Sequence, residues 1–424
     1  DVWIEGWGFD ETKLAEHRAP TVDDLDQVTT EQPIFIYRSD VIHQWQLKSL
    51  ALAGIDQNTP DPKGGHIERF PDGRPNGFMR EVAASQLLIR AKSAQSYEND
   101  VQNMVNSSDH YLENGIVAIG EMRVGSIPTY AALYQDAVKQ GFKPRASIYY
   151  VYDELKPGQD LDPVGDDQLR VAGIKIFMDG SISGETADNS LPYPSGKRGV
   201  LLTDQTKLKT AIEFAQKHQL QTAIHAMGDA AIQLVLDTTC DLDPWLDDMF
   251  NRIEHASLLS DQMLDQINHA KMWYGLSTQP IFFFAEDESY RSYLTPEQFK
   301  LAYRVKSMLN KGTDDLSSDA PCTPWAEPGS PFYSIYAAVT RQAANNDVVN
   351  IEEAITVPQA ILGYTKWAAE IGGFTHNGTL EVGKSADFVI LNKDIFSAAK
   401  DELATVNANE TWFKGQRVYQ KSSK

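Results

Sequence analysis

Four strand-like segments of the chain end in a side chain that can bind a metal ion. These side chains are Lys175, His225, His255 and Asp319, in that order along the chain. If the segments are successive parallel strands, their carboxyl ends meet at one mouth of a barrel, where barrel enzymes carry out their chemistry. The order and the placement predict a hydrolytic metal site with these four residues as ligands.

Lys175 is flanked by two isoleucines, so strand alternation puts its side chain on the opposite face from theirs. A bare ammonium inside a barrel is costly, and lysine readily loses its proton when it is desolvated. A neutral amine can add carbon dioxide and become a carbamate, an anionic oxygen ligand able to bridge two metal ions. The alternative interpretation is an ordinary ion pair of Lys175 with Asp179 or Glu185.

His225 and His255 each close a strand of suitable length, and imidazole is the commonest ligand for zinc and related ions. A single histidine at a strand end is more often structural, but two in successive units after the lysine strand favour ligands. Asp319 stands before Ala320-Pro321, where proline ends the strand. A carboxylate there usually caps a turn; in a metal site it takes the proton of a water acidified to a pKa of about 7. Asp319 is therefore the predicted catalytic general base and later general acid.

The composition limits the partners. The 424 residues carry 59 Asp and Glu against 38 Lys and Arg, a formal charge of −21. Such a surface repels phosphate backbones and anionic lipid, so we expect a small neutral or cationic molecule as substrate, with neither nucleic acid nor membrane as partner. Cys240 and Cys322 are too few for a disulfide framework. Cytoplasmic and periplasmic locations both stay open, as does a homodimer.

The order of elements predicts an α/β fold. From about residue 112, short apolar runs alternate with amphipathic stretches, the pattern of βα units in a parallel sheet. Seven such strands are predicted, at 116–119, 146–150, 174–177, 222–225, 252–255, 272–277 and 315–319. Predicted helices lie at 129–140, 206–218, 228–237, 260–269, 296–310, 334–344 and 350–363. A closed (β/α)8 TIM-like barrel needs eight strands, so one strand is missing at the front.

Three parts are predicted along the chain. Residues 1–110 are rich in turns and read as an insertion, or lid, over the mouth of the barrel. Residues 111–378 form the barrel. Residues 379–424 form a small β unit, with a strand within 381–391 and a hairpin within 410–419 that turns at Lys414-Gly415.

Several motifs, in their shared order, resemble the amidohydrolase superfamily. Within it they are most similar to amidohydrolase family 3, the metal-dependent hydrolases that include N-substituted formamide deformylases. The resemblance extends through most of the chain and rests on stretches such as Gly6-Trp-Gly-Phe-Asp10, Ile174-Lys-Ile-Phe-Met-Asp-Gly-Ser181, His225-Ala-Met-Gly-Asp229, Glu254-His255, Ser318-Asp-Ala-Pro321 and Gly378-Thr-Leu-Glu-Val-Gly-Lys-Ser-Ala-Asp387.

The resemblance implies that Lys175 is carboxylated, that Lys175, His225, His255 and Asp319 bind one or two divalent ions, and that Asp319 shuttles protons. Zinc is the leading candidate for the ion. The resemblance also implies a β-sandwich domain made from both chain ends, of which residues 379–424 supply the C-terminal part.

The chain departs from the family in two places. The family carries a His-x-His pair on its first barrel strand, and no His-x-His occurs in this sequence. We interpret the sequence as the later part of a longer protein that lacks the first barrel strand and the N-terminal sandwich strands, and we expect this form alone to bind metal poorly. The family also usually shows Asp-Gly-His where this chain has Arg38-Ser-Asp-Val-Ile-His43. His43 matches by its spacing to Ser49, but Val41-Ile42 replace the Asp-Gly of the family.

The leading functional hypothesis is a metal-dependent amidohydrolase that cleaves a carbon–nitrogen bond of a non-peptide amide in a small molecule. His43 and Trp7, on the predicted lid, are the expected substrate contacts, although aromatic residues there could equally form its core. Two alternatives are a catalytically silent barrel with a binding or regulatory role, and a phosphoesterase that uses the same ligands.

Overall fold

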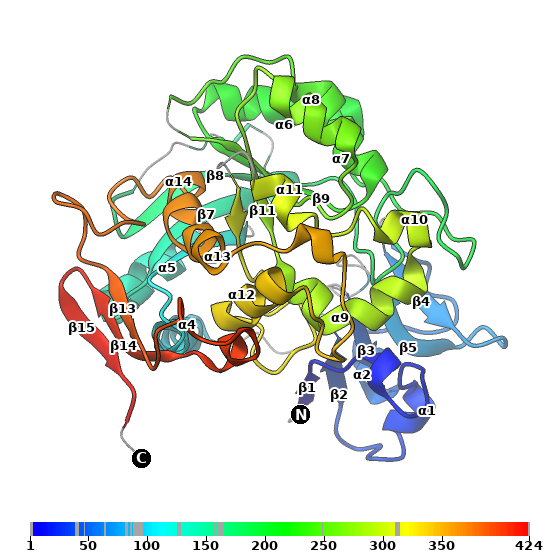
Figure 1. The fold of residues 1–424 in the computed structure, drawn as a ribbon. Helices are drawn as coiled ribbons and strands as arrows, with labels where there is room; N and C mark the ends of the chain where they lie inside the picture. The colour runs from blue at the N-terminus through cyan, green and yellow to red at the C-terminus, as the bar shows by residue number, and fades with distance from the viewer. Residues whose placement is uncertain are drawn as a thin grey trace.

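The computed structural model shows three β-sheets with helices packed around the largest of them (Figure 1). The residues that the structure describes are 3–38, 42–45, 47–62, 65–80, 84, 87, 96–124, 129–156, 158–159, 161, 165–247, 249–309 and 314–422.

The central sheet contains seven parallel strands in sequence order, each paired with its neighbours along the chain. They are β6 (Ala118–Val124), β7 (Arg145–Val151), β8 (Leu169–Phe177), β9 (Gln221–Ala226), β10 (Asn251–His255), β11 (Tyr274–Thr278) and β12 (Asp315–Leu316). Parallel strands covered on both faces read as nearly continuous apolar runs, and every residue of β7, β10 and β11 is buried. The curled sheet is consistent with a TIM-like barrel, and all seven predicted strands are present, although β12 is only two residues long.

Helices connect the strands, and the first four of them pack on the outer face of the sheet, whereas the fifth belongs to a second hydrophobic core. Those between β6 and β12 are α5 (Thr129–Gln140), α6 (Gln205–Lys217), α7 (Asp229–Thr239), α8 (Asp261–His269), α9 (Pro280–Tyr293), α10 (Pro296–Phe299) and α11 (Val305–Leu309). In α6, four buried residues recur at helical spacing, which gives the helix one apolar face. The predicted helix at 296–310 is split in two, because the chain turns through a positive φ at Tyr303.

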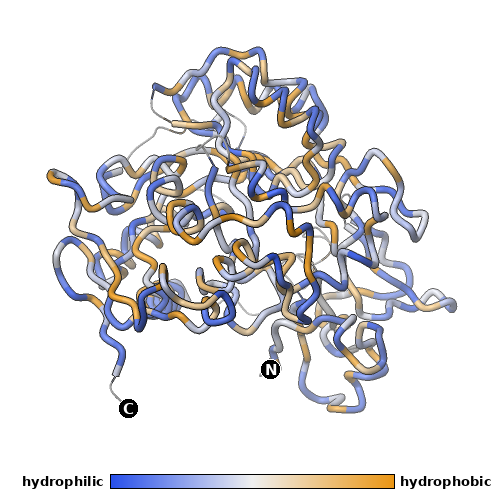
Figure 2. Tube along the Cα trace, viewed as in Figure 1, coloured by the Kyte–Doolittle hydropathy of each residue, from blue (hydrophilic) through white to orange (hydrophobic). Residues whose placement is uncertain are grey.

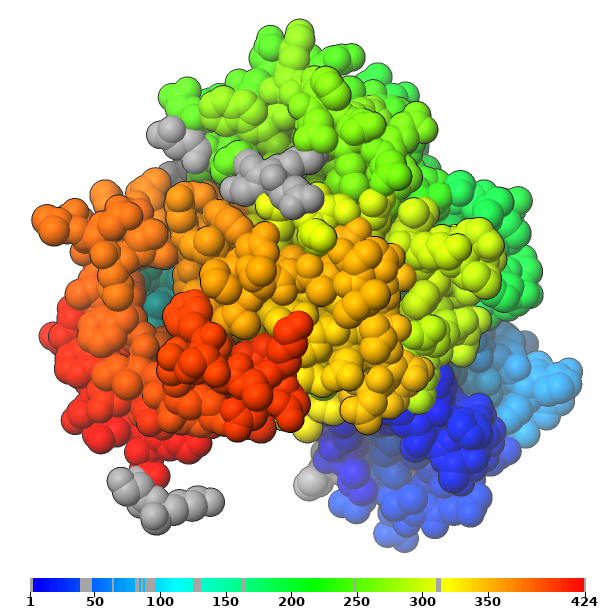
Figure 3. Space-filling view, viewed as in Figure 1, coloured from blue at the N-terminus to red at the C-terminus, as the bar shows by residue number. Residues whose placement is uncertain are grey.

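Further helices precede and follow these units. They are α4 (Tyr97–Glu113), α12 (Pro331–Thr340), α13 (Val357–Tyr364) and α14 (Lys366–Ile371), with short 3-10 turns at Tyr152–Glu154, Ile351–Glu353 and Lys400–Thr405. Elements α12 and α13 fill the front of the molecule between the two smaller sheets (Figure 3). Hydrophilic residues predominate along the outer loops (Figure 2). Within the described part of the chain, no helix combines the length and the apolar character needed to cross a bilayer.

A five-stranded sheet in the order β1-β2-β3-β5-β4 precedes the barrel strands. Its strands are β1 (Ile4–Trp7), β2 (Ile34–Tyr37), β3 (Ile42–Trp45), β4 (His66–Arg69) and β5 (Pro75–Arg80), accompanied by a 3-10 turn at Glu11–Lys13 and helices α1 (Val22–Leu25) and α2 (Leu47–Leu52). This unit has its own small core around Phe35 and Met79. Arg38 ties it to α9, since its fully buried guanidinium lies 2.6 Å from Glu11 and 3.2 Å from Glu286.

Three antiparallel strands close the chain, namely β13 (Phe388–Leu391), β14 (Ala408–Phe413) and β15 (Gln416–Gln420). The hairpin turns at Lys414 and Gly415, which both have positive φ, as the Lys-Gly pair predicts. The sheet is joined to the amino end of the barrel strands, because Arg145 of β7 lies 2.6 Å from Asp387. The predicted division of the chain at residues 110 and 379 stays a prediction.

Candidate metal centre

Three of the four predicted ligands lie at the carboxyl ends of the adjacent strands β8, β9 and β10. In the register of these strands, Phe177 pairs with His225, and Glu254 of β10 also pairs with His225. Lys175 lies two residues before Phe177 on the same face, and His255 is the last residue of its strand. The sheet therefore brings these side chains to one end of the barrel.

The two histidine rings contact each other. Their centroids are 4.6 Å apart, with an angle of 71° between the ring planes. The ring of Phe177 lies 5.4 Å from that of His225, and Phe282 of α9 stacks on His255 at 5.8 Å. Aromatic packing thus fixes the position of both imidazoles from two sides.

One nitrogen of His225 already has a partner. Its Nε2 lies 3.0 Å from the carbonyl oxygen of Gly180 and 3.4 Å from Oδ1 of Asp179. A carbonyl oxygen only accepts hydrogen bonds, so Nε2 carries the proton and Nδ1 carries the lone pair. A second hydrogen bond of this kind is what orients a histidine that ligates a metal. The geometry leaves Nδ1 of His225 as the atom that can bind an ion.

In His255 the nitrogen that can bind an ion is Nε2, the opposite one from that in His225. Its Nδ1 lies 2.8 Å from Oε1 of Gln279. The amide of Gln279 is oriented by its own Nε2, which donates to the carbonyl of Ser277 at 3.0 Å and to Oγ of Ser317 at 2.8 Å. Oε1 must therefore accept, which places a proton on Nδ1 of His255 and the lone pair on Nε2.

Asp179 organises the loop behind His225. Its carboxylate accepts hydrogen bonds from the backbone N–H groups of Asp188, Met227 and Gly228, at 2.8 to 3.1 Å. Burial raises the pKa of Asp179 to about 8, against the effect of these three donors. At Gly228 a Cβ atom would lie 2.2 Å from the carbonyl oxygen of Asp188, so only glycine allows this close approach. This contact is a physical reason for glycine in His225-Ala-Met-Gly-Asp229.

Both imidazoles are neutral at physiological pH. Burial lowers the pKa of His225 well below 6.5 and that of His255 to about 3. The nearby charge of Lys175 acts in the same direction on both. Neutral imidazole is the form that binds metal ions.

Lys175 is buried, with 4% of its surface exposed. Burial lowers the pKa of its amine, while the charges of Glu254 and Asp319 oppose that shift. An ordinary ion pair of Lys175 would need Asp179 or Glu185, and both carboxylates have other partners. Asp179 accepts the backbone hydrogen bonds described above, and Glu185 lies 2.8 Å from Lys197. The amine of Lys175 lies instead 5.2 Å from the centre of the Phe177 ring, next to the histidine pair.

Asp319 lies in the loop that follows β12, three residues past the strand end, and has a φ of +48°. Its carbonyl oxygen accepts a hydrogen bond from the N–H of Cys322 at 2.9 Å. The next residue, Thr323, donates to Glu286 of α9 at 3.1 Å, which fastens the loop. Asp319 is close enough to Lys175 to affect its pKa.

The donor set fits a divalent ion in part. Two neutral imidazoles in contact, with one lone pair each, and a desolvated amine beside them have the chemistry of such a site. Across the described ranges, however, no three His, Cys, Asp or Glu side chains are grouped closely enough to hold an ion. The carboxylate of Asp319 therefore does not lie close enough to the two histidines to form a three-ligand site with them.

The two predicted substrate contacts lie on the first sheet. His43 belongs to β3, where it pairs with Tyr37 and Met79, and its side chain falls outside the described part of the structure. Trp7 is the last residue of β1, is 42% exposed, and lies 4.8 Å from the ring of Tyr37. Among the described ring contacts, none joins Trp7 to the histidine pair.

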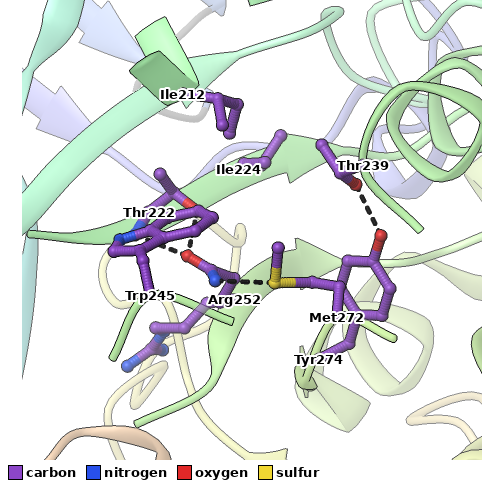
Figure 4. Close-up of a pocket in the computed structure, with 9 residues that line it drawn as sticks. Ile212, Thr222, Ile224, Thr239, Trp245, Arg252, Met272 and Tyr274 are labelled. Carbon is purple, nitrogen blue, oxygen red and sulfur yellow. Dashed lines mark hydrogen bonds between the residues drawn. The ribbon is translucent and has the colours of Figure 1, made fainter. Parts of the chain in front are cut away.

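A narrow internal gap between the sheet and its outer helices is a separate feature (Figure 4). It has no room for a water molecule. Polar groups around it satisfy one another, as in the hydrogen bonds from Thr222 to Asn251 at 2.7 Å and between Thr239 and Tyr274. The gap belongs to the packed core and is not a ligand site.

A curled parallel sheet with neutral histidines at its strand ends defines the class of metal-dependent barrel hydrolases. The chain belongs to the amidohydrolase family, whose model matches residues 1–419. It is accordingly an amidohydrolase, a hydrolase that acts on carbon–nitrogen bonds.

Two named relatives extend over nearly the whole chain. YtcJ of Bacillus subtilis is 27% identical over 99% of this chain and 80% of its own length. N-substituted formamide deformylase of Arthrobacter pascens is 27% identical over 99% of this chain and 79% of its own.

The solved structures that resemble this chain include uncharacterized metal-dependent hydrolases from two archaea. The protein from Pyrococcus horikoshii is 25% identical, with a TM-score of 0.72 over 94% of this chain and 78% of its own. The protein from Pyrococcus furiosus is 28% identical, with a TM-score of 0.68 over 91% and 76%. These similarities support a divalent metal as the cofactor.

Sequence reasoning missed two residues of this region. Gln279 directly follows β11, so the rule that identified the other strand ends would have found it, had amides been considered beside metal ligands. Arg123 of β6 reaches Phe177, with its guanidinium carbon 5.6 Å from the ring centre. A strand irregularity redirects Arg123, and a regular alternation cannot predict that.

Proposed function

We propose that this amidohydrolase cleaves the carbon–nitrogen bond of a non-peptide amide in a small molecule. The observation that carries the proposal is the pair of neutral histidines beside a desolvated lysine at the strand ends. The name of the relative from Arthrobacter pascens supports N-substituted formamides as a first substrate class. A catalytically silent barrel and a phosphoesterase are not favoured.

In this proposal Nδ1 of His225 and Nε2 of His255 would hold a divalent ion, for which zinc is the first candidate. When bound, such an ion polarises a carbonyl group and makes water more acidic. The protein fixes both imidazoles through Gly180 and Gln279, and the hydrophobic ring of Phe282 excludes water from one side of His255.

We propose that Lys175 is carboxylated. Its amine is buried and burial lowers its pKa, which favours the neutral form of the amine that can add carbon dioxide. Loss of the proton from nitrogen then gives a carbamate, an oxygen donor beside the histidines. This added group would supply the third ligand that the unmodified side chains do not gather, and it would allow one or two ions.

Asp319 is the proposed proton carrier. Its carboxylate would take a proton from the attacking water and return it to the leaving nitrogen, which then departs as an amine. The loop position of Asp319, past the end of a two-residue strand, allows it to approach the ion and the substrate. His43 and Trp7 remain proposed substrate contacts from the first sheet.

The finer architecture belongs to the same proposal. Strands β6 and β12 are the two ends of the seven-stranded order. We propose that an eighth strand, with the His-x-His pair of the family, closes the barrel between them. The sheet of β13, β14 and β15 would be the C-terminal part of a β-sandwich.

The test uses full-length protein, supplemented with zinc or manganese, and a panel of N-formyl and N-acyl amides. At least one bound ion per chain and turnover of a panel member are expected, and both are to be lost in H255N. The matched control is H218N, which changes a histidine at the end of α6. Less than one ion per chain after supplementation would overturn the proposal.

A further inference from the structure

The mouth of the barrel carries a further charged side chain, that of Arg123. The inference about its role rests on the function proposed above. We propose that the guanidinium of Arg123 binds a carboxylate of the substrate, so that the preferred substrates are N-acyl or N-formyl amino acids. In such a molecule one carbon atom separates the carboxylate from the nitrogen of the amide that is cleaved.

Strand β6 delivers Arg123 to the mouth through a bulge. Along β6 and β7 the register runs from Ala118 opposite Arg145 to Glu121 opposite Ile148, and then resumes with Val124 opposite Tyr150. Three steps on β6 thus match two on β7, which leaves one extra residue on β6 between Glu121 and Val124. Bulges of this kind redirect side chains and are common beside active sites.

Arg123 reaches across the mouth as a result. Phe177 is on β8, two strands away from β6, and neighbouring strands are about 4.8 Å apart. The guanidinium carbon of Arg123 nevertheless lies 5.6 Å from the centre of the Phe177 ring. The side chain therefore extends past the carboxyl end of β7 toward the candidate metal centre.

The Phe177 ring joins Arg123 to that centre. The ring of His225 is 5.4 Å from the Phe177 ring and the amine of Lys175 is 5.2 Å from its centre. A substrate amide at the histidines and a carboxylate one carbon further on would span the short distance to Arg123. The aromatic face holds the planar guanidinium in position without using its N–H groups.

Within the described part of the chain, the guanidinium has no acidic partner. Arg123 forms no ion pair with any described side chain, whereas Arg252, deeper in the same barrel, lies 2.6 Å from Glu254. Glu121, the acidic neighbour of Arg123, accepts hydrogen bonds from the backbone N–H of Arg123 at 3.1 Å and from the hydroxyl of Tyr134 at 2.8 Å. Arg123 is partly exposed, so a substrate can reach it.

The chemistry selects a carboxylate. Guanidinium is always charged and offers two parallel N–H donors that match the two oxygens of a carboxylate. An acidic substrate departs from the neutral or cationic molecule expected from the net charge of −21, and Arg123 is the local cation that would hold it against that long-range repulsion. Water then adds to the amide carbonyl carbon, the carbon–nitrogen bond breaks, and a proton passes to the nitrogen. The products are a carboxylic acid and a free amino acid.

The test compares N-formyl-leucine with N-(3-methylbutyl)formamide, the same amide without the carboxylate. With metal-supplemented full-length protein, R123M is expected to lower kcat/KM for N-formyl-leucine by about 10- to 100-fold and to change that for the neutral amide by less than about twofold. R123K keeps the charge but loses the paired donors, so it should recover part of the loss. The control is R74M, whose guanidinium lies 4.9 Å from the Phe70 ring on the first sheet.

A second measurement does not depend on turnover. N-formyl-leucine is titrated into metal-stripped wild-type, R123M and R74M proteins, and binding is followed by saturation-transfer NMR. Weaker binding to R123M alone is expected. Equal preference of the wild type for both amides, or equal binding to wild type and R123M, would overturn the assignment and leave the proposed function standing. If neither amide nor the wider panel is cleaved, the proposed function fails, and the binding result alone decides for Arg123.

Discussion

The two sides of the candidate centre are built differently. On one side, His225 and His255 lie at the carboxyl ends of strands of six and five residues, contact each other, and each have one nitrogen committed to a hydrogen-bond acceptor. On the other side, Asp319 follows a strand of two residues and lies in a loop with left-handed backbone. The comparison teaches that the ion would be held by the histidine side, at the strand ends, while the proton would be carried by the loop side.

Replacing Asp319 by asparagine should have the largest effect, on the rate. Asparagine keeps the shape of the side chain but cannot take a proton, so kcat should fall by about 10²- to 10⁴-fold. In the full-length protein the metal content should stay close to one ion or more per chain, because the histidines remain. Steady-state kinetics and elemental analysis of the same preparation measure both quantities.

The control for this variant is S318A, which changes the neighbouring residue of the same loop. Among the described residues, its hydroxyl accepts a hydrogen bond from the N–H of Ala320 at 3.3 Å. Loss of metal from D319N would contradict the comparison, since Asp319 would then act as a ligand together with the histidines.

Replacing either histidine by asparagine should act on affinity. H225N and H255N each remove a lone pair from the centre, so the metal dissociation constant should rise by about 100-fold or more, beyond what changes at supporting residues produce. Competition with a chelator of known affinity measures it. The variant H218N, in which a histidine that contacts Phe214 is changed, should bind metal as the wild type does. Unchanged metal affinity in both H225N and H255N would show that neither histidine binds the ion.

Gln279 contacts His255 but is not a proposed ligand. A Gln279 variant therefore tests whether the contacts that orient the histidines contribute to metal affinity. Q279L removes the acceptor for Nδ1 of His255, so the imidazole can adopt the other tautomer, and metal affinity should fall by about 10- to 100-fold. Nitrogen-15 chemical shifts of His255 in metal-free protein report the tautomer directly. The control is Q298L, which removes a buried glutamine that caps α10 and should leave the His255 signals in place. A wild-type tautomer in Q279L would show that Gln279 does not set it.

The alternation of strands and helices was enough to predict the seven parallel strands and most of the helices. The strand ends, read with the parallel order, also predicted that Lys175, His225 and His255 come together, because register alone fixes those positions. The rest depends on local departures from regularity. The bulge that redirects Arg123 and the left-handed turn at Asp319 leave no periodic signal.

Hydrogen-bond partners distant in sequence were equally hidden. Gln279 is 24 residues from His255, and Gly180 is 45 residues from His225. A carbonyl oxygen is present at every residue, so the sequence cannot indicate that the carbonyl of Gly180 sets a tautomer. Such partners become visible only when the strands are placed side by side.

Two buried carboxyl groups inside the barrel extend the comparison to stability. Glu254, on the histidine side, lies 2.6 Å from Arg252, and the charge of Arg252 holds its pKa below the usual value against burial. Asp315 of β12 has no such close partner among the described ion pairs, and burial raises its pKa to about 6. Asp315, whose pKa is raised in the folded protein, stabilises the fold at low pH, where its carboxyl group is protonated in both the folded and the unfolded state. That contribution is lost as pH rises from about 4 through 6.

The smallest expected effect follows from Asp315. Asparagine does not titrate, so from pH 5 to pH 6 the wild type should lose about 1 kcal/mol of stability relative to D315N, because only its carboxyl group must be ionised in the core. Thermal unfolding of metal-free wild type and D315N at both pH values measures the difference, which should shift the relative midpoints by about 1 to 2 °C. E254Q serves as the comparison variant, since the lowered pKa of Glu254 predicts a pH trend of opposite sign. If the stability of wild type and D315N changed with pH in parallel, the pKa of Asp315 would not be raised in the folded protein. The two sides of the centre would then differ only in their proposed ligands.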